Sequence, residues 1–330
     1  MNFNKNRRVF FYLGILVSVV FLYLSFRSID YDILINNISK LSVAHILMSV
    51  ICLLFSYIIR AIRWKYILID RDIKFSKLYS ASMIGNMGNN IFPFRLGEVI
   101  KCYVLSYQEG ISKSKIMASV VFERILDGIT IILIFSLSLL FIDVGQIFVD
   151  AAIVALSVFI IAMLTIILSK HREDLFFKIV PFIFFFLPER INKRLNSMLI
   201  PFLAGFDVIH NKKYFFIAIL YSFILWSFGI LGAYFVLLST NNPISIDLPI
   251  ILISALVIGV MAPSAPGFIG TYHFVVIFVL GVYGWEKGES ASISIVLHGI
   301  QFILPIFIGL ILTFRLGYSI NGLVDSNIQK

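Results

Sequence analysis

Long apolar runs alternate along the chain with short polar loops, a pattern typical of proteins that cross a membrane several times. Windows of about 20 apolar residues predict full membrane spans. Six such windows occur: Val9–Phe26, Val43–Ile62, Met117–Ile142, Phe148–Ser169, Tyr214–Ser239 and Ser290–Phe314. Hydropathy therefore predicts an all-α polytopic membrane protein, with residues 1–330 forming a single integral membrane domain.

Two further apolar regions, Leu78–Tyr107 and Leu248–Val282, are interrupted by Pro, Gly and Asn residues. Each half is about 14 residues long, which is too short to cross a bilayer alone. Irregular backbone at membrane depth is tolerated only where it is buried in protein or lines a polar cavity. We therefore predict two re-entrant helical hairpins, and a pair of broken segments is typical of a transporter's binding site.

The basic residues predict an orientation. With the N-terminus in the cytoplasm, 22 of the 27 Lys and Arg residues fall in internal loops and three in external ones. Basic loops stay in the cytoplasm, so both termini are predicted there, in a multi-pass protein of the cytoplasmic membrane. The basic loop after the fourth span contains a short apolar segment, Leu175–Leu187, for which we expect an interfacial helix.

The order of the predicted elements repeats. Residues 9–142 contain two spans, a hairpin and a third span, and residues 148–315 contain the same order. Because each half crosses the membrane three times, the halves are predicted to be an inverted repeat. The two hairpins would then enter from opposite sides, and their tips would meet near the midplane.

Composition agrees with this class and excludes others. Hydrophobic residues make up 60% of the chain, and only 14% are charged. Soluble domains have about 45–50% apolar and about 25% charged residues. No nucleotide-binding, hydrolase or paired-histidine metal motif occurs in the sequence. We therefore expect no enzymatic activity, cofactor, metal or nucleic-acid partner.

Charged residues at helical spacing lie in the first broken region and in the span after it: Arg95, Glu98, Lys101, Glu123, Arg124 and Asp127. Each charge costs about 2.5–3.5 kcal/mol within a membrane, so these side chains should face inward and pair. Arg95 or Lys101 can meet a carboxylate of the span, and Glu98 can meet Arg124. The network either only holds the hairpin to the span, or leaves an arginine partly free to bind phosphate.

Polar and small residues at both breaks are further candidates for binding a lipid headgroup: Asn86, Asn90, Pro266, Gly267, Gly270, Thr271 and His273. The asparagines either line a polar cavity or only satisfy backbone at a turn. A half-helix beginning near Gly267 would present free N–H groups to an anion, although such breaks also act as plain hinges. His273 either binds a headgroup or is a packing residue.

Asn90–Glu98 together with Glu123–Asp127 resembles the pattern N-x-x-P-x-R-x-G-E followed by E-R-x-x-D. Pro263–Gly270 resembles a later P-x-x-P-G-G-x-G-x-x-E. Over nearly its whole length the chain is similar to the membrane domain of lysylphosphatidylglycerol synthases, the flippase-like UPF0104 family. The sequence departs from the pattern at Phe268, in place of Gly, and at His273, in place of Glu.

The resemblance implies translocation of an anionic lipid, either a phospholipid derivative or a polyprenyl-phosphate-linked sugar. It does not imply lysyl transfer, because the aminoacyl-transferase domain of the full synthases does not occur in this sequence. One alternative is a membrane-embedded lipid-modifying transferase, with Glu98, Glu123 or Asp127 as its base. Another is a non-catalytic partner of a separately encoded glycosyltransferase or synthase.

Overall fold

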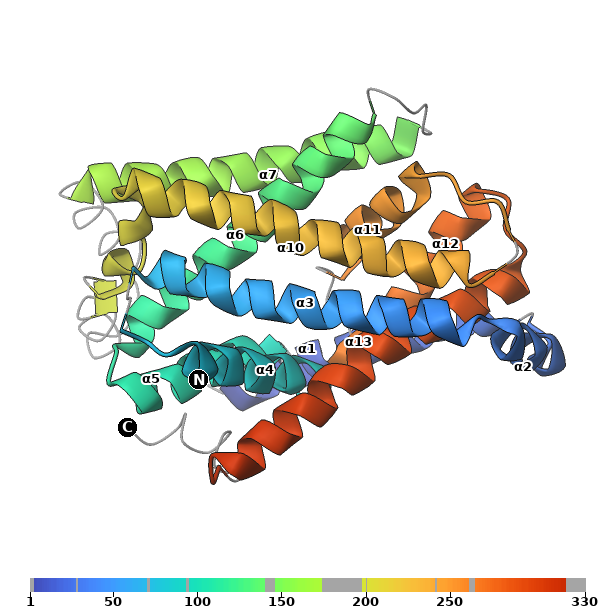
Figure 1. Ribbon diagram of the computed structural model, residues 1–330, viewed down its shortest axis with the longest axis horizontal. Helices are drawn as coiled ribbons and strands as arrows, with labels where there is room; N and C mark the ends of the chain where they lie inside the picture. Colours follow the sequence, from blue (N-terminus) through green and yellow to red (C-terminus); the bar gives the residue numbers. More distant parts are fainter. Residues whose placement is uncertain are drawn as a thin grey trace.

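The computed structural model describes residues 3–27, 29–69, 72–92, 95–139, 146–173, 198–199, 201–240, 242–260 and 265–318. Within these ranges all regular structure is helical, and the long helices run roughly along one axis of the molecule (Figure 1). The expected interfacial helix at Leu175–Leu187 and the breaks at Pro93 and Pro263 lie outside the described residues.

The six predicted spans all fall on long helices: α1 (Phe3–Phe26), α3 (Val43–Leu68), α6 (Lys113–Ser138), α7 (Gln146–His171), α10 (Lys212–Leu238) and α13 (Lys287–Arg315). Segments of α3, α7, α10 and α13 are long and apolar enough to cross a membrane. The chain is therefore a multi-pass membrane protein. That α1 and α6 also cross it stays a prediction.

The predicted end of the second span was wrong. Hydropathy ended it at Ile62, but α3 continues to Leu68. The extra turns contain Arg63 and Trp64, and both side chains are fully buried in the protein. A charged residue that is paired inside the protein ends an apolar window without ending the helix.

Each broken region folds as two helices that lie side by side and antiparallel. In the first, α4 (Phe75–Ile91) and α5 (Leu96–Glu109) are joined at their open end by the ion pair of Lys77 and Glu109, with 2.7 Å between Nζ and Oε1. In the second, α11 (Asp247–Gly259) and α12 (Thr271–Val282) are joined by a hydrogen bond from the Tyr283 hydroxyl to Asp247. These helices have 12–17 residues and are at most about 26 Å long, shorter than a bilayer core.

The two helix pairs open toward opposite ends of the molecule (Figure 1). The open end of α4 and α5 lies beside the end of α13, where the Tyr107 and Tyr318 rings are 5.9 Å apart. At the other end, Ser42 before α3 donates a backbone hydrogen bond to Ser239 after α10. The broken tips meet in the middle of the long helices. Re-entry into the bilayer and an inverted repeat are compatible with this arrangement and stay predictions.

A short helix, α2 (Tyr31–Lys40), was not predicted. Asp30 caps it by accepting a hydrogen bond from the Asp32 backbone N–H at 2.8 Å. Its buried Leu34 lies against α13, where the Ser292 hydroxyl donates to the Leu34 carbonyl at 3.4 Å. A hydropathy window of membrane length cannot detect a helix of 10 residues that buries one narrow face.

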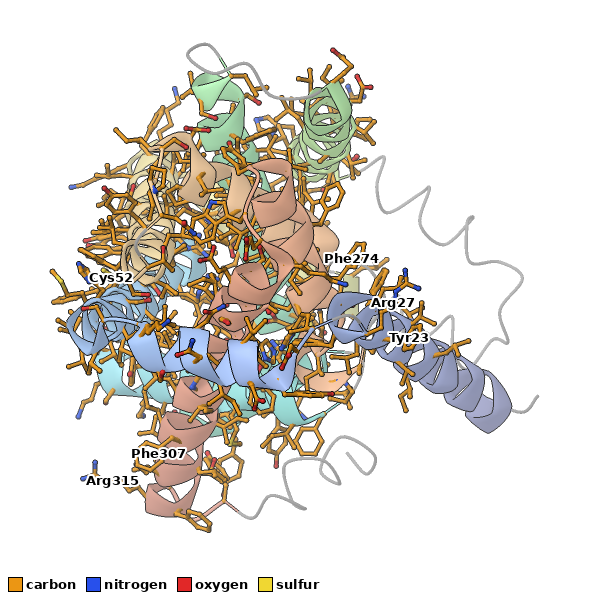
Figure 2. All side chains as sticks on the ribbon, turned by 90° about the vertical axis from the view of Figure 1, so that its right-hand side faces the viewer. Tyr23, Arg27, Cys52, Phe274, Phe307 and Arg315 are labelled. Atoms are coloured by element: carbon orange, nitrogen blue, oxygen red, sulfur yellow. The ribbon has the colours of Figure 1, made fainter. Side chains whose placement is uncertain are left out.

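Large apolar side chains also cover the outside of the molecule, as expected for a surface in contact with lipid. Phe307 on α13 is 62% exposed and points away from the other helices (Figure 2). Phe274 on α12 instead lies against α1, where it stacks on Phe21 with ring centroids 4.6 Å apart (Figure 2).

Candidate functional site

Three glycines bring α4 and α5 into backbone contact at the first break. A Cβ added at Gly88 would lie 2.9 Å from the Gly97 Cα, and one added at Gly85 would lie 2.8 Å from the Lys101 Cβ. No side chain at Gly88 or Gly97 would fit without moving the backbone. Small residues permit such helix–helix contact inside membranes.

A fully sealed ion network lies behind this break. The Lys101 ammonium pairs with Glu123, and Arg63 donates to Asp127 at 2.6 Å and lies 3.4 Å from Glu123. Arg60 adds a second contact to Asp127, at 2.8 Å. The side chains of Arg63 and Glu123 are fully buried, and those of Lys101 and Asp127 are 4% and 6% exposed. The predicted pairing of Lys101 with a carboxylate of the third span is confirmed.

An accessible edge borders the sealed network. The Arg124 guanidinium lies 3.6 Å from Glu98 and 3.5 Å from Asp127, which confirms the predicted pairing of Glu98 with Arg124. The side chain of Arg124 is 39% exposed, and that of Glu98 is 21% exposed. The network therefore has a closed side, formed by the buried pairs of Lys101, Arg63, Glu123 and Asp127, and an open side, formed by Arg124 and Glu98.

Of the two residues that the prediction allowed to pair with the span, Lys101 does so, and Arg95 does not pair with a carboxylate among the described residues. It is exposed, within electrostatic range of Arg124 and Glu98, and donates to the Val260 carbonyl at 2.5 Å. Its guanidinium also lies 5.2 Å from the Phe268 ring centroid, a cation–π contact. Its backbone is left-handed, with φ of 52°, which turns the side chain across to the second break.

Sequence reasoning missed Arg60, Arg63 and Ser222. Both arginines were counted with the internal loop charges, although Arg60 lies within the predicted span and Arg63 directly follows it, and α3 carries both into the network. Ser222 on α10 accepts a hydrogen bond from Arg63 at 2.8 Å. The signal in the sequence was that large apolar residues continue after Arg63, at Trp64, Tyr66, Ile67 and Leu68.

The charges of this central region do not balance. The basic side chains are Arg60, Arg63, Arg95, Lys101 and Arg124, and the acidic ones are Glu98, Glu123 and Asp127. Among the described residues this leaves a surplus of two positive charges in the middle of the long helices. Lys101, Arg63 and Arg60 contact two carboxylates, Glu123 and Asp127, whereas Arg95 and Arg124 lie near one further carboxylate, Glu98. One of the two surplus charges therefore lies on the open side.

The second break is held by neighbouring helices. Pro266 begins the short 3-10 turn η3 (Pro266–Phe268), and the Ala265 N–H donates to the Ser18 hydroxyl of α1 at 2.7 Å. His298 of α13 lies with Nε2 2.7 Å from the Gly267 carbonyl oxygen. Gly270 precedes α12 with φ of 91°, and an added Cβ would collide with the backbone of Ser18.

Gly267 was expected to leave its backbone open to a headgroup, but protein fills the space beside it. A Cβ at this position would come within 2.8 Å of the Phe302 ring and 3.2 Å of the Asn90 carbonyl oxygen. The residue also has φ of 68°, a conformation that favours glycine. In this conformation of the protein, packing between the two breaks therefore accounts for Gly267.

We expect Gly267→Ala to lower the free energy of unfolding by roughly 1–3 kcal/mol, because the added methyl group meets Phe302 and the backbone is left-handed. Chemical denaturation of the purified protein in detergent measures the change. Gly281→Ala is the matched control, since nothing lies within 4 Å of that position. Equal stability of the two variants would contradict the packing role.

The remaining candidate residues divide between the two breaks. Asn90 donates to the carbonyls of Gln301 and Phe302, at 3.3 Å and 3.1 Å, and so ties the first break to α13. Asn86 is half-buried on α4 and makes no hydrogen bond with the described residues. Thr271 Oγ1 and His273 Nδ1 are buried without a hydrogen-bond partner among the described residues. The His273 and His298 rings are 4.7 Å apart.

Comparison with known proteins gives a consistent family. The lysylphosphatidylglycerol synthase TM region matches residues 11–309. A UPF0104 membrane protein of Pyrococcus horikoshii is 26% identical over 92% of this chain and 96% of its own length. One of Methanocaldococcus jannaschii is 24% identical over 90% and 92%. The glycosyltransferase AglD of Haloferax volcanii is 30% identical over 38% of this chain and 20% of its own length. No solved structure matches the chain.

Proposed function

The chain belongs to the lysylphosphatidylglycerol synthase TM region family, and from that premise we propose that it moves an anionic lipid across the cytoplasmic membrane. The lipid is a phospholipid derivative or a polyprenyl-phosphate-linked sugar. Its phosphate binds at the open side of the ion network, where the two breaks meet.

The observation that carries this proposal is the surplus of two positive charges in the network, one of which lies on its open side. Unbalanced charge is costly at membrane depth, and a bound phosphate offsets it. Among the arginines of this central region, Arg95 and Arg124 have the more exposed side chains, and the planar fork of arginine suits phosphate oxygens. The sealed pairs behind them act as a frame that holds α5 and α6 together.

Arg95 connects phosphate binding to the contact between the breaks. Its hydrogen bond goes to Val260, the residue that ends α11, whose carbonyl is a neutral acceptor. A phosphate adds ion–ion attraction and can accept two parallel hydrogen bonds from the guanidinium fork, whereas the carbonyl oxygen is uncharged. A phosphate therefore competes for Arg95 and releases it from Val260, which allows the two tips to separate while the lipid is bound.

A leaflet-accessibility assay tests the proposal. Proteoliposomes carry a fluorescent phosphatidylglycerol analogue in both leaflets, and dithionite outside the vesicles quenches only the outer one. Translocation exposes the inner pool to quenching, whereas protein-free vesicles retain it. If protein-containing vesicles retain the inner pool of every anionic lipid tested, the proposal is wrong. Mass spectrometry of lipids bound to the purified protein identifies which analogues to use.

The transferase alternative is less well supported by the geometry. A general base needs a free carboxylate, but Glu123 and Asp127 each contact two or more basic side chains and are sealed from solvent. Only Glu98 of the three candidates is partly exposed. We therefore keep the proposal of a transporter rather than an enzyme.

A second candidate function rests on the similarity to AglD. That protein is a glycosyltransferase, and the region like this chain covers 20% of its length. The relation favours a role as the membrane partner of a separately encoded glycosyltransferase. Co-purification of a glycosyltransferase with the tagged protein from its native membrane would support this role, and it is compatible with lipid transport.

We expect both termini to lie in the cytoplasm. Cysteines placed at the exposed positions Asp32 and Ser112 lie at opposite ends of the molecule. The native Cys52 and Cys102 are buried, so they give little background. A membrane-impermeant maleimide added to intact cells should label Asp32→Cys and not Ser112→Cys. The reverse pattern would invert the proposed orientation.

A further inference from the structure

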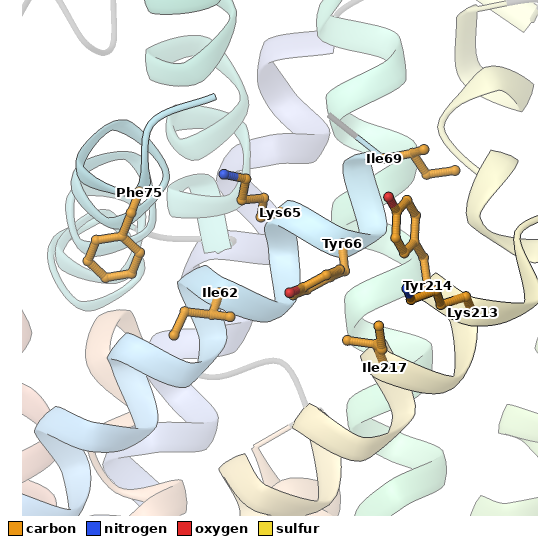
Figure 3. Close-up of a pocket in the computed structure, with 8 residues that line it drawn as sticks. All are labelled: Ile62, Lys65, Tyr66, Ile69, Phe75, Lys213, Tyr214 and Ile217. Carbon is orange, nitrogen blue, oxygen red and sulfur yellow. The ribbon is translucent and has the colours of Figure 1, made fainter. Parts of the chain in front are cut away.

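A cavity of about 590 Å³ lies between the end of α3, the start of α4 and the start of α10, and none of the residues that line it belongs to the ion network (Figure 3). This volume is within the range of sites for small molecules. Of the described residues that line it, only Lys65 and Lys213 are charged. Its other walls come from isoleucine, phenylalanine and tyrosine side chains of three helices.

The charge of this cavity favours an anion. Neither lysine forms an ion pair with a described residue. Asp207, the last acidic residue before α10 in the sequence, pairs with Lys170 at 2.8 Å. The first turn of α10 contains Lys212 and Lys213 and no acidic residue. Helix N-termini carry a partial positive charge that favours acidic residues, so these lysines add to an electrostatic potential that a bound anion would offset.

The walls of the cavity favour a lipid over a soluble anion. Ile62 and Ile217 line it, and the next outward-facing residues on the same helices are exposed and apolar: Ile58 is 36% exposed and Leu220 is 58% exposed. The apolar face is therefore continuous from the cavity to the lipid-facing surface. Tyr66 and Tyr214, with ring centroids 5.7 Å apart, lie where aromatic residues mark the membrane–water interface.

We propose that this cavity, the Lys65–Lys213 site, binds the phosphate headgroup of an anionic phospholipid. Lys65 and Lys213 lie on different sides of the cavity and supply the positive charge that attracts the phosphate, and an acyl chain follows the outer faces of α3 and α10. The site shares no residue with the ion network, so lipid binding at this site can be measured without a transport assay. It lies at the end of the molecule that we assign to the cytoplasm.

Native mass spectrometry of the purified full-length protein, titrated with phosphatidylglycerol, tests the site. Each basic residue near a membrane surface strengthens binding about fivefold, so Lys65→Gln/Lys213→Gln should weaken binding roughly thirtyfold. Lys212→Gln is the matched control: it removes a neighbouring charge that does not line the cavity. Wild-type affinity in the double variant, or an equal loss in Lys212→Gln, would overturn the proposal. Thermal unfolding of each variant shows whether it is folded.

Two further measurements distinguish a lipid from a free anion. Ile217→Trp should fill the cavity and weaken phosphatidylglycerol binding while both lysines remain. Inorganic phosphate should not displace the lipid at concentrations that match it. Displacement by inorganic phosphate, or wild-type lipid binding by a folded Ile217→Trp protein, would overturn the assignment to a lipid.

Phosphatidylcholine, which has no net charge, should bind the wild type and the double variant alike, and a preference for it over phosphatidylglycerol would also overturn the proposal.

Discussion

Arg95→Ala should reduce lipid translocation by roughly tenfold to a hundredfold, because hydrogen bonds to a charged group contribute about 1.5–3 kcal/mol. The expected effect on folding is much smaller. Arg95 is exposed, and the structure gives it one hydrogen bond, to the Val260 carbonyl. The leaflet-accessibility assay measures the transport rate, and thermal unfolding in detergent measures the stability of the same preparation.

Two variants separate the roles of Arg95. Arg95→Gln can still donate to the Val260 carbonyl but carries no charge, whereas Arg95→Lys keeps the charge and loses the planar fork. If phosphate binding is the role, Arg95→Gln should be as slow as Arg95→Ala, and Arg95→Lys should be intermediate. Translocation at the wild-type rate by a stable Arg95→Gln protein would show that phosphate does not bind here.

Glu123→Gln should lower the free energy of unfolding by about 3–5 kcal/mol, the usual cost of stranding a buried charge. Glu123 is fully buried and is the ion-pair partner of Lys101, which is 4% exposed. After the substitution the ammonium group would remain buried beside the Trp64 ring, 3.8 Å from its centroid, without that partner. Chemical denaturation in detergent and the yield of folded protein in the membrane measure the loss.

The double variant Glu123→Gln/Lys101→Met is the decisive control. It removes the stranded ammonium group and replaces it with an apolar chain of similar length, so it should be more stable than Glu123→Gln alone. Arg63 keeps its contact with Asp127 at 2.6 Å in both variants. A double variant that is less stable than the single one would show that Lys101 is not stranded, and that its other contacts matter more.

Helical spacing predicted part of this network and not the rest. Glu98 and Lys101 are one turn apart and share a face of α5, and their pairing with charged residues of α6 was predicted from helical periodicity alone. The contributions of Arg60 and Arg63 depend on how α3 packs against α6, which the sequence pattern of either helix does not contain. Long-range packing, rather than local propensity, decided which arginines were buried.

Arg95 also shows which features the sequence predicts and which depend on packing. Its position at the first break was evident from the sequence, but its left-handed backbone and its partner on α11 were not. A break frees the backbone from the helical pattern, so the direction of a side chain there depends on the neighbouring segment. Both breaks were found from Pro and Gly residues, whereas the contacts between them required the structure.

The glycine contacts between α4 and α5 determine where this protein is mechanically stiff. The two backbones are in contact at Gly85, Gly88 and Gly97, and an ion pair joins Lys77 and Glu109 at the open end. The helix pair therefore resists internal bending. The polar contacts between the tips are fewer: Arg95 contributes one hydrogen bond to Val260 and one cation–π contact with Phe268, beside the packing of Gly267 near Asn90. Contacts of these kinds are worth about 1–3 kcal/mol each. Thermal motion should therefore be largest at the contact between the tips, and each helix pair should move about this contact as a rigid body.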